Sequence, residues 1–144
     1  MVSVEHDREW FEKVLSLLGE QNLENVTLLL KEPNTGPPFR KFQRFSERSM
    51  RGYINAPQNY LKAGEVDLVF VDGRQRISCA LAAAGLMKAG GYLMIHDFWP
   101  GLRYRARLPE LLEQYGYVLE SPSREKDQGL AVFRKRERGS CRGM

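Results

Sequence analysis

The chain has 144 residues, of which 42% are hydrophobic and 28% are charged, and these values favour a single globular domain. No apolar run approaches the roughly 20 residues that a membrane-spanning helix needs, and the N-terminus lacks the apolar core of a secretory signal. The two cysteines, Cys79 and Cys141, match no metal-binding spacing. The sequence therefore predicts a cytoplasmic protein without a membrane anchor.

The net charge of +4 originates at the C-terminal end of the chain. Five basic residues and one acidic residue lie from Arg134 onward, and the remainder is neutral. A basic end of this kind is typical of a solvated, disordered tail. We therefore predict one domain over residues 1–134 and a basic disordered tail over residues 135–144.

The N-terminal part begins with an alternation of strand and helix patterns. Val2–Glu5 predicts a very short strand that ends in an acid. Residues 6–18 carry apolar side chains at helical spacing, with Gly19 as the expected end of the helix. The β-branched apolar run over residues 25–30 predicts the next strand.

Residues 31–51 interrupt this alternation with prolines and a basic–aromatic segment, FRKFQRFSER. One interpretation is a loop that binds single-stranded nucleic acid through charge and stacking. In the other interpretation, which we favour, three phenylalanines at a spacing of three hold a short helical turn against the domain while the charges stay solvated. They are Phe39, Phe42 and Phe45.

The run VDLVFVDG, residues 66–73, is the stretch around which the rest of the chain is organised. Its length and composition predict a strand buried on both faces and ending at Asp72. The run GYLMIHD, residues 91–97, has the same form and ends in His96 and Asp97. Ligands of open α/β sheets bind beyond the carboxyl ends of the strands, so we expect the two ends to lie side by side.

The remaining patterns complete an α/β chain. Further helices are predicted over residues 56–61, 75–87 and 104–115, with Cys79 as a packing residue. The last two strands, over residues 117–120 and 130–133, are expected to pair antiparallel. The alternation predicts a mostly parallel sheet that helices cover on both faces, with a terminal antiparallel strand pair.

The order of these features resembles the class I S-adenosylmethionine-dependent methyltransferases. The resemblance rests on a strand followed by an acid in VSVEHD, a strand ending in VDG, the segment KAGGYLMIHDF and a final strand in LAVFRK. It covers nearly all of the chain before the tail. It implies a Rossmann-like fold, S-adenosylmethionine as cofactor, and methyl transfer to oxygen or nitrogen of a small-molecule acceptor.

The resemblance also assigns the cofactor side of the site. Glu5 matches the acid that holds the ribose hydroxyls of the cofactor, and His6 follows it directly. A carboxylate suits this role because it accepts two hydroxyl donors at once. Asp72 matches the strand-end acid that lies near the methyl donor and the acceptor.

Three residues at the strand ends are implied on the acceptor side: Asp72, His96 and Asp97. In the metal-dependent, catechol-type branch, the counterparts of Asp72 and Asp97 share a divalent ion such as Mg²⁺, but Phe98 stands here in place of that branch's asparagine. His96 is alternatively a general base, because its unperturbed pKa lies near neutrality. The structural alternative is that Asp72 only caps the next helix and that His96 and Asp97 only end a strand.

One part of the methyltransferase pattern is missing. In that family a first strand and its glycine-rich loop precede the strand that here ends at Glu5, and this chain contains no G-x-G-x-x-G motif. We therefore expect an N-terminally truncated domain that is weak or inactive as an enzyme by itself. The alternative function is a non-catalytic module that contacts nucleic acid through residues 39–51 and the basic tail.

The missing strand would lie between the strands VSVE and VDLVFVD. Its absence predicts that these two strands share no neighbour. Because a long apolar strand with an unpaired edge associates readily, we expect self-association or strand donation by another chain at this incomplete sheet.

Overall fold

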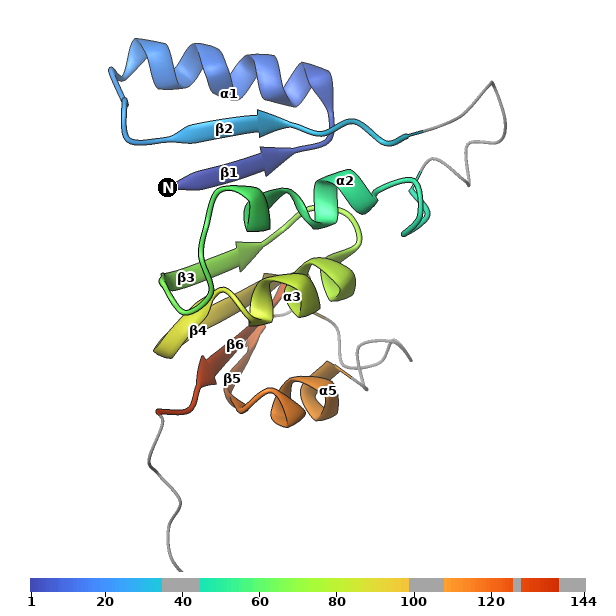
Figure 1. Ribbon diagram of the computed structural model, residues 1–144, viewed down its shortest axis with the longest axis vertical. Helices are drawn as coiled ribbons and strands as arrows, with labels where there is room; N and C mark the ends of the chain where they lie inside the picture. Colours follow the sequence, from blue (N-terminus) through green and yellow to red (C-terminus); the bar gives the residue numbers. More distant parts are fainter. Residues whose placement is uncertain (35–44, 99–107, 126–127, 138–144) are drawn as a thin grey trace, which may run out of the picture. The chain divides into compact units, whose positions relative to one another are not determined.

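The computed structural model describes residues 1–34, 45–98, 108–125 and 128–137. They belong to two compact units (Figure 1). The first unit comprises Met1–Tyr60 and Gly73–Gln75, and the second comprises Leu61–Asp72 and Arg76–Met144. Within the described ranges, no helix has the length and apolar character needed to cross a membrane.

The first unit contains a two-stranded parallel sheet, β1 (Val2–Glu5) with β2 (Thr27–Leu30), and the helix α1 (Arg8–Glu20) that connects them. Asp7 caps α1, because its side chain accepts the backbone N–H groups of Glu9 and Trp10. The helix runs past Gly19, so the predicted end is wrong. The turn closes instead at Asn22, which takes the left-handed conformation with φ of 52° that asparagine tolerates well.

Two short helical segments complete the first unit. They are α2 (Arg51–Ile54) and the 3₁₀-helix η1 (Ala56–Asn59), which has Pro57 near its start. Their buried side chains are Ile54 and Ala56. A proline is tolerated here because the first turn of a helix has no partner for its backbone N–H groups.

The second unit contains a four-stranded mixed sheet with the order β3-β4-β6-β5. β3 (Val66–Val71) pairs parallel with β4 (Met87–His96). β6 (Gln128–Lys135) pairs antiparallel with β4 on one side and with β5 (Tyr117–Glu125) on the other. The predicted α/β architecture, the side-by-side placement of β3 and β4, and the terminal antiparallel pair are confirmed.

The helices α3 (Arg76–Ala84) and α5 (Leu108–Gln114) pack on one face of this sheet. α3 is shorter than the predicted helix over residues 75–87, because Met87 already pairs with Val66 as part of β4. The buried core between helices and sheet contains alternate residues of the strands and small or branched residues of the helices. Its members include Val71, Leu93, Ile95, Ala131, Phe133, Ala80, Ala84, Leu108 and Leu112.

The opposite face of the sheet stays open among the described residues. The pairing register places Leu68, Tyr92, Arg134 and Val118 in one row on this face. Leu68 is 53% exposed and Phe70 is 56% exposed. The prediction that β3 is buried on both faces is therefore wrong, since the described helices of the second unit cover only its other face.

The other edge of β3 pairs with no strand in the described part of the chain. β1 and β3 belong to different sheets, and each has a single strand neighbour. Among the described residues, β1 and β3 therefore have no strand neighbour in common.

The second unit extends slightly into the segment predicted as a tail. Lys135 is the last residue of β6, and its Nζ donates to the carbonyl oxygens of Met87 at 2.7 Å and Ala84 at 3.4 Å. The Tyr117 hydroxyl donates to the same Ala84 oxygen at 2.7 Å. The Ala84 carbonyl lies at the end of α3, which leaves it without a helical partner, and the Met87 carbonyl belongs to the start of β4. Residues 138–144 lie outside the described ranges.

Candidate functional site

Two strand ends of the second unit bring acidic and imidazole side chains together. β3 and β4 are parallel, and Val71 pairs with Ile95, so Asp72 and His96 follow at the same edge of the sheet. Nδ1 of His96 lies 2.6 Å from Oδ1 of Asp72. The His96 side chain is 29% exposed and the Asp72 side chain 55%, so the pair is accessible to a ligand.

Asp97 completes this group through an unusual backbone conformation. Its φ of 51° lies in the left-handed region, and its Oδ1 is 3.8 Å from Nδ1 of His96. The next residue is held firmly, because the backbone N–H of Phe98 donates to the Gly129 carbonyl at 2.7 Å and Phe98 is buried. A Cβ at position 129 would overlap the Phe98 carbonyl, so the close approach requires glycine.

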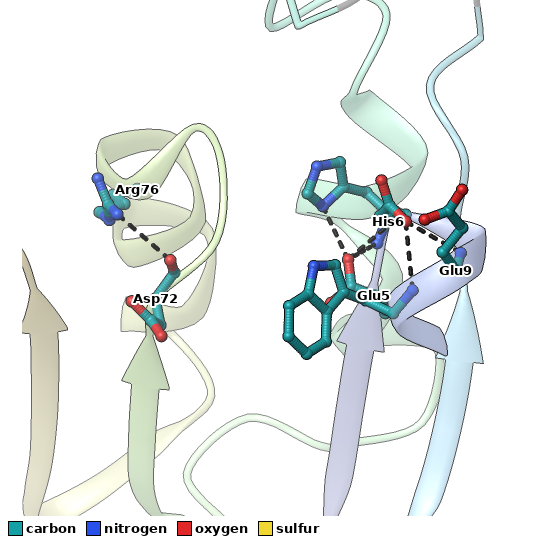
Figure 2. Close-up of polar contacts among 7 residues, drawn as sticks. Glu5, His6, Glu9, Asp72 and Arg76 are labelled. Atoms are coloured by element: carbon teal, nitrogen blue, oxygen red, sulfur yellow. Dashed lines mark hydrogen bonds and ion pairs between the residues drawn. The ribbon is translucent and has the colours of Figure 1, made fainter. Parts of the chain in front are cut away.

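Arg76, at the start of α3, is a member of the group that the sequence analysis did not single out. Its Nη2 donates to Oδ2 of Asp97 at 3.1 Å and to the backbone oxygen of Asp72 at 3.3 Å. Figure 2 shows the second of these contacts. The sequence feature that could have identified Arg76 is its position, since it is a basic residue four positions after Asp72. We name Asp72, Arg76, His96 and Asp97 the strand-end cluster.

The predicted cofactor residues Glu5 and His6 lie together at the end of β1 in the first unit. Oε1 of Glu5 accepts the backbone N–H groups of His6 at 2.6 Å and of Asp7 at 2.9 Å, and it lies 3.0 Å from Nδ1 of His6 (Figure 2). Within the described residues no hydrogen bond is formed to Oε2 of Glu5. One carboxylate oxygen thus fixes the turn after β1, and the other stays available to an external donor.

Aromatic side chains surround His6 within the first unit. The ring of Phe45 lies edge-on to the His6 ring at 5.7 Å between centroids, and that of Tyr53 at 5.4 Å. The Arg74 guanidinium stacks 4.8 Å from the Phe45 ring centroid. The packing expected for the phenylalanines is thus observed for Phe45, whereas Phe39 and Phe42 lie outside the described residues.

The glycine of the VDG sequence has a packing role in the same unit. A Cβ on Gly73 would overlap the hydroxyl of Tyr53. The Gln75 side chain donates to the Phe45 carbonyl, and Gln75 has a left-handed φ of 53°. A side chain at position 73 would therefore have to displace the Tyr53 hydroxyl, which is the end of a flexible side chain.

The predicted site residues form two groups, each in its own compact unit. Asp72, His96 and Asp97 are brought together in the second unit, and Glu5 and His6 in the first. Burial raises the pKa of the Cys79 thiol to about 12, which disfavours the reactive thiolate, and Cys79 packs against the core as predicted.

The fold resembles that of solved methyltransferases. A methyltransferase-like protein from Silicibacter pomeroyi is 24% identical, with a TM-score of 0.61 over 94% of this chain and 68% of that one. A putative methyltransferase from Streptococcus mutans in complex with SAH is 13% identical, with a TM-score of 0.60 over 93% and 74%. An rRNA methylase from Streptococcus thermophilus is 12% identical, with a TM-score of 0.62 over 94% of this chain and 73% of that one.

No protein-family model matches the sequence, and a search of curated proteins finds no relative. The structural similarities establish the fold: this chain has a class I methyltransferase-like, Rossmann-like α/β fold. It spans roughly two thirds to three quarters of the length of the three solved proteins, as their covered shares of 68%, 74% and 73% show.

Proposed function

We propose that the chain acts in S-adenosylmethionine-dependent methyl transfer to an oxygen or nitrogen atom of a small-molecule acceptor. The observation that carries the proposal is the contact of 2.6 Å between His96 and Asp72 at the carboxyl ends of adjacent parallel strands. In open α/β sheets this edge is where ligands bind. The fold, shared with solved methyltransferases, supports the choice of reaction.

Bound S-adenosylmethionine would supply a methyl group on a positively charged sulfur. The role of the protein residues is to remove the acceptor proton. Asp72 accepts the Nδ1–H of His96 and thereby fixes the neutral imidazole with Nε2 unprotonated. Nε2 then takes the proton of the acceptor hydroxyl or amine as that atom forms its bond to the methyl carbon. The cofactor would lose its positive charge on giving up the methyl group, and His96 would take up the acceptor proton, so the charge would balance.

Glu5 and His6 are proposed as cofactor-binding residues. The unoccupied Oε2 of Glu5 suits the ribose hydroxyls, since each hydroxyl donates one hydrogen bond to a carboxylate. Asp72 is proposed as a further cofactor contact by the same resemblance. We expect weak activity because the chain has no G-x-G-x-x-G motif to cradle the cofactor through close backbone approach.

A divalent cation is the alternative use of the strand-end cluster. Asp72, His96 and Asp97 each offer a ligand atom, and these atoms lie within 4.8 Å of one another. A site with an imidazole suits Zn²⁺ or Mn²⁺ better than Mg²⁺, which prefers oxygen ligands. The Arg76 guanidinium, 3.1 Å from Oδ2 of Asp97, already neutralises one carboxylate. This positive charge opposes a bound cation and favours the proton-transfer role.

Calorimetry with S-adenosylmethionine and S-adenosylhomocysteine tests the proposal directly. We expect both to bind, and Glu5→Gln to weaken both by about tenfold, because one charge-assisted acceptor of a ribose hydroxyl is lost. Glu9→Gln is the matched control, since Glu9 lies in the first turn of α1 and has no assigned role. Absence of heat both from the 144-residue chain and from a chain extended by a strand and glycine-rich loop would contradict the proposal.

Metal titration separates the two uses of the strand-end cluster. If the cluster transfers protons, methyl transfer persists in EDTA and added Mn²⁺ or Zn²⁺ produces no saturable heat. Saturable binding that Asp97→Asn removes would instead establish the cation site.

A further inference from the structure

We propose that the open edge of β3 pairs antiparallel with β3 of a second copy of this chain, forming a continuous eight-stranded sheet. The proposal concerns assembly and does not depend on methyl transfer. It rests on the exposure of β3, on the contrast between β3 and the other sheet edges, and on the self-complementarity of its sequence.

The edge of β3 displays apolar side chains beside unpaired backbone. Within the described residues β3 has β4 as its single strand neighbour, so one row of its backbone N–H and C=O groups has no sheet partner. Leu68 and Phe70 are more than half exposed at 53% and 56%. Tyr92, paired with Leu68, extends this apolar surface onto β4.

The other sheet edges carry features that discourage strand pairing. β5 contains Pro122, which has no N–H to donate, and the charged residue Glu120. β1 is only four residues long. Proline, charge and short length are the usual protection of edge strands. β3 has six residues and no proline, and Asp67 is its single charged residue.

The β3 sequence is complementary to itself in the antiparallel direction. With Val69 of one copy opposite Val69 of the other, Leu68 faces Phe70 of the second copy, and Phe70 faces Leu68. Directly opposite residues share a face of the sheet. Two Leu–Phe pairs would therefore form on the open face, and in each pair the leucine of one copy would pack against the phenylalanine of the other. Cross-strand pairs of this kind stabilise a sheet.

Charge does not oppose this register. Asp67 lies opposite Val71 of the second copy, so no two carboxylates within the strands meet. Its carboxylate is also paired with Lys88 on β4, which lowers the Asp67 pKa through a hydrogen bond and charge attraction. An antiparallel second copy would therefore give the free backbone groups of β3 hydrogen-bond partners and cover its apolar side chains. It would do so without bringing carboxylates of the two strands together.

Sedimentation velocity over a roughly hundredfold range of protein concentration tests the inference. We expect a monomer–dimer equilibrium that Phe70→Lys weakens by at least about tenfold, since the substitution occurs twice in each symmetric dimer. Tyr115→Lys is the matched control: Tyr115 is 58% exposed and lies after α5, so its replacement leaves the equilibrium unchanged. A chain that stays monomeric throughout, or a dimer that Phe70→Lys leaves intact, overturns the inference.

The register has its own test by disulfide formation in a Cys79→Ala, Cys141→Ser background. A mixture of the Leu68→Cys and Phe70→Cys chains is expected to form a mixed disulfide dimer faster than either chain forms its own. Equal rates for the three combinations overturn this register. Circular dichroism of each variant checks that the fold is retained. If a strand from an unrelated chain covers the edge of β3 instead, the purified protein would stay monomeric in the sedimentation experiment, and this result overturns the inference.

Discussion

At the scale of single residues, the chemistry of the chain is concentrated where two strands end. Asp72 holds the imidazole of His96, and Arg76 holds the carboxylate of Asp97. The four side chains form two pairs, a hydrogen-bonded pair and an ion pair, rather than an isolated base. We expect the Asp72–His96 contact to select one imidazole tautomer, because a fixed acceptor at Nδ1 would leave Nε2 free to accept a proton.

Replacing Asp72 with alanine is expected to remove this tautomer selection. Nitrogen NMR of the imidazole reports which ring nitrogen carries the proton. In the unmodified chain the neutral His96 ring should be protonated at Nδ1, and in Asp72→Ala that preference should fall. Asp67→Ala is the control, because Asp67 lies in β3, the strand that Asp72 follows, and pairs with Lys88 instead. An unchanged tautomer ratio in Asp72→Ala would show that Asp72 does not orient the ring.

At the scale of secondary-structure elements, the geometry of the site depends on how β4 and β6 meet. His96 pairs with Leu130 at the end of their ladder, and the Phe98 N–H continues the contact to Gly129. Phe98 also packs edge-on against Phe133 of β6, with centroids 6.2 Å apart. The β4–β6 pairing thus holds the backbone on both sides of Asp97.

Gly129→Ala is therefore expected to destabilise the chain by about 1–3 kcal/mol, the usual cost of forcing extra atoms into a close-packed position. Urea unfolding measures the change in the free energy of unfolding. Gly85→Ala provides the control, because a Cβ there meets no atom within 4 Å and Gly85 has no positive φ. Equal stabilities of the two variants would contradict the close approach of Gly129 to Phe98.

At the scale of the whole molecule, stability should depend on pH in the alkaline range. Burial raises the pKa of Cys79 and of Tyr117 to about 12, whereas the unfolded values are about 8.5 and about 10. Between these limits the folded state keeps protons that the unfolded state has released. Unfolding then becomes more favourable as pH rises, so this contribution to stability is complete below about pH 8.5 and is lost toward about pH 12.

Urea unfolding midpoints at about pH 8, 9.5 and 11 check this expectation. The midpoint should fall with pH, and it should fall less in the Cys79→Ala, Tyr117→Phe variant, which has neither titrating group. At the lowest pH the variant should be less stable, since it loses the hydrogen bond from the Tyr117 hydroxyl to the Ala84 carbonyl, worth about 1 kcal/mol. Parallel pH profiles for the two proteins would contradict a role for these buried groups.

The sequence by itself determined the element order, the polar residues at the ends of β3 and β4, and the pairing of the last two strands. These features follow from local patterns: apolar runs of strand length, helical spacing, and polar residues directly after a strand. The methyltransferase-like fold, and a missing strand between β1 and β3, were instead expected from the resemblance to class I methyltransferases. The assignment of Glu5 and His6 to the cofactor stays a prediction.

Only the tertiary structure decided which side chains meet. It showed that Arg76 joins Asp97, that Asp97 takes a left-handed backbone, and that aromatic rings surround His6. It also showed that β3 is exposed on one face, although its composition matches a strand buried on both. An apolar composition shows that a strand can be buried on both faces. Whether it is buried depends on which elements pack against it, and these contacts join residues that are distant in the sequence.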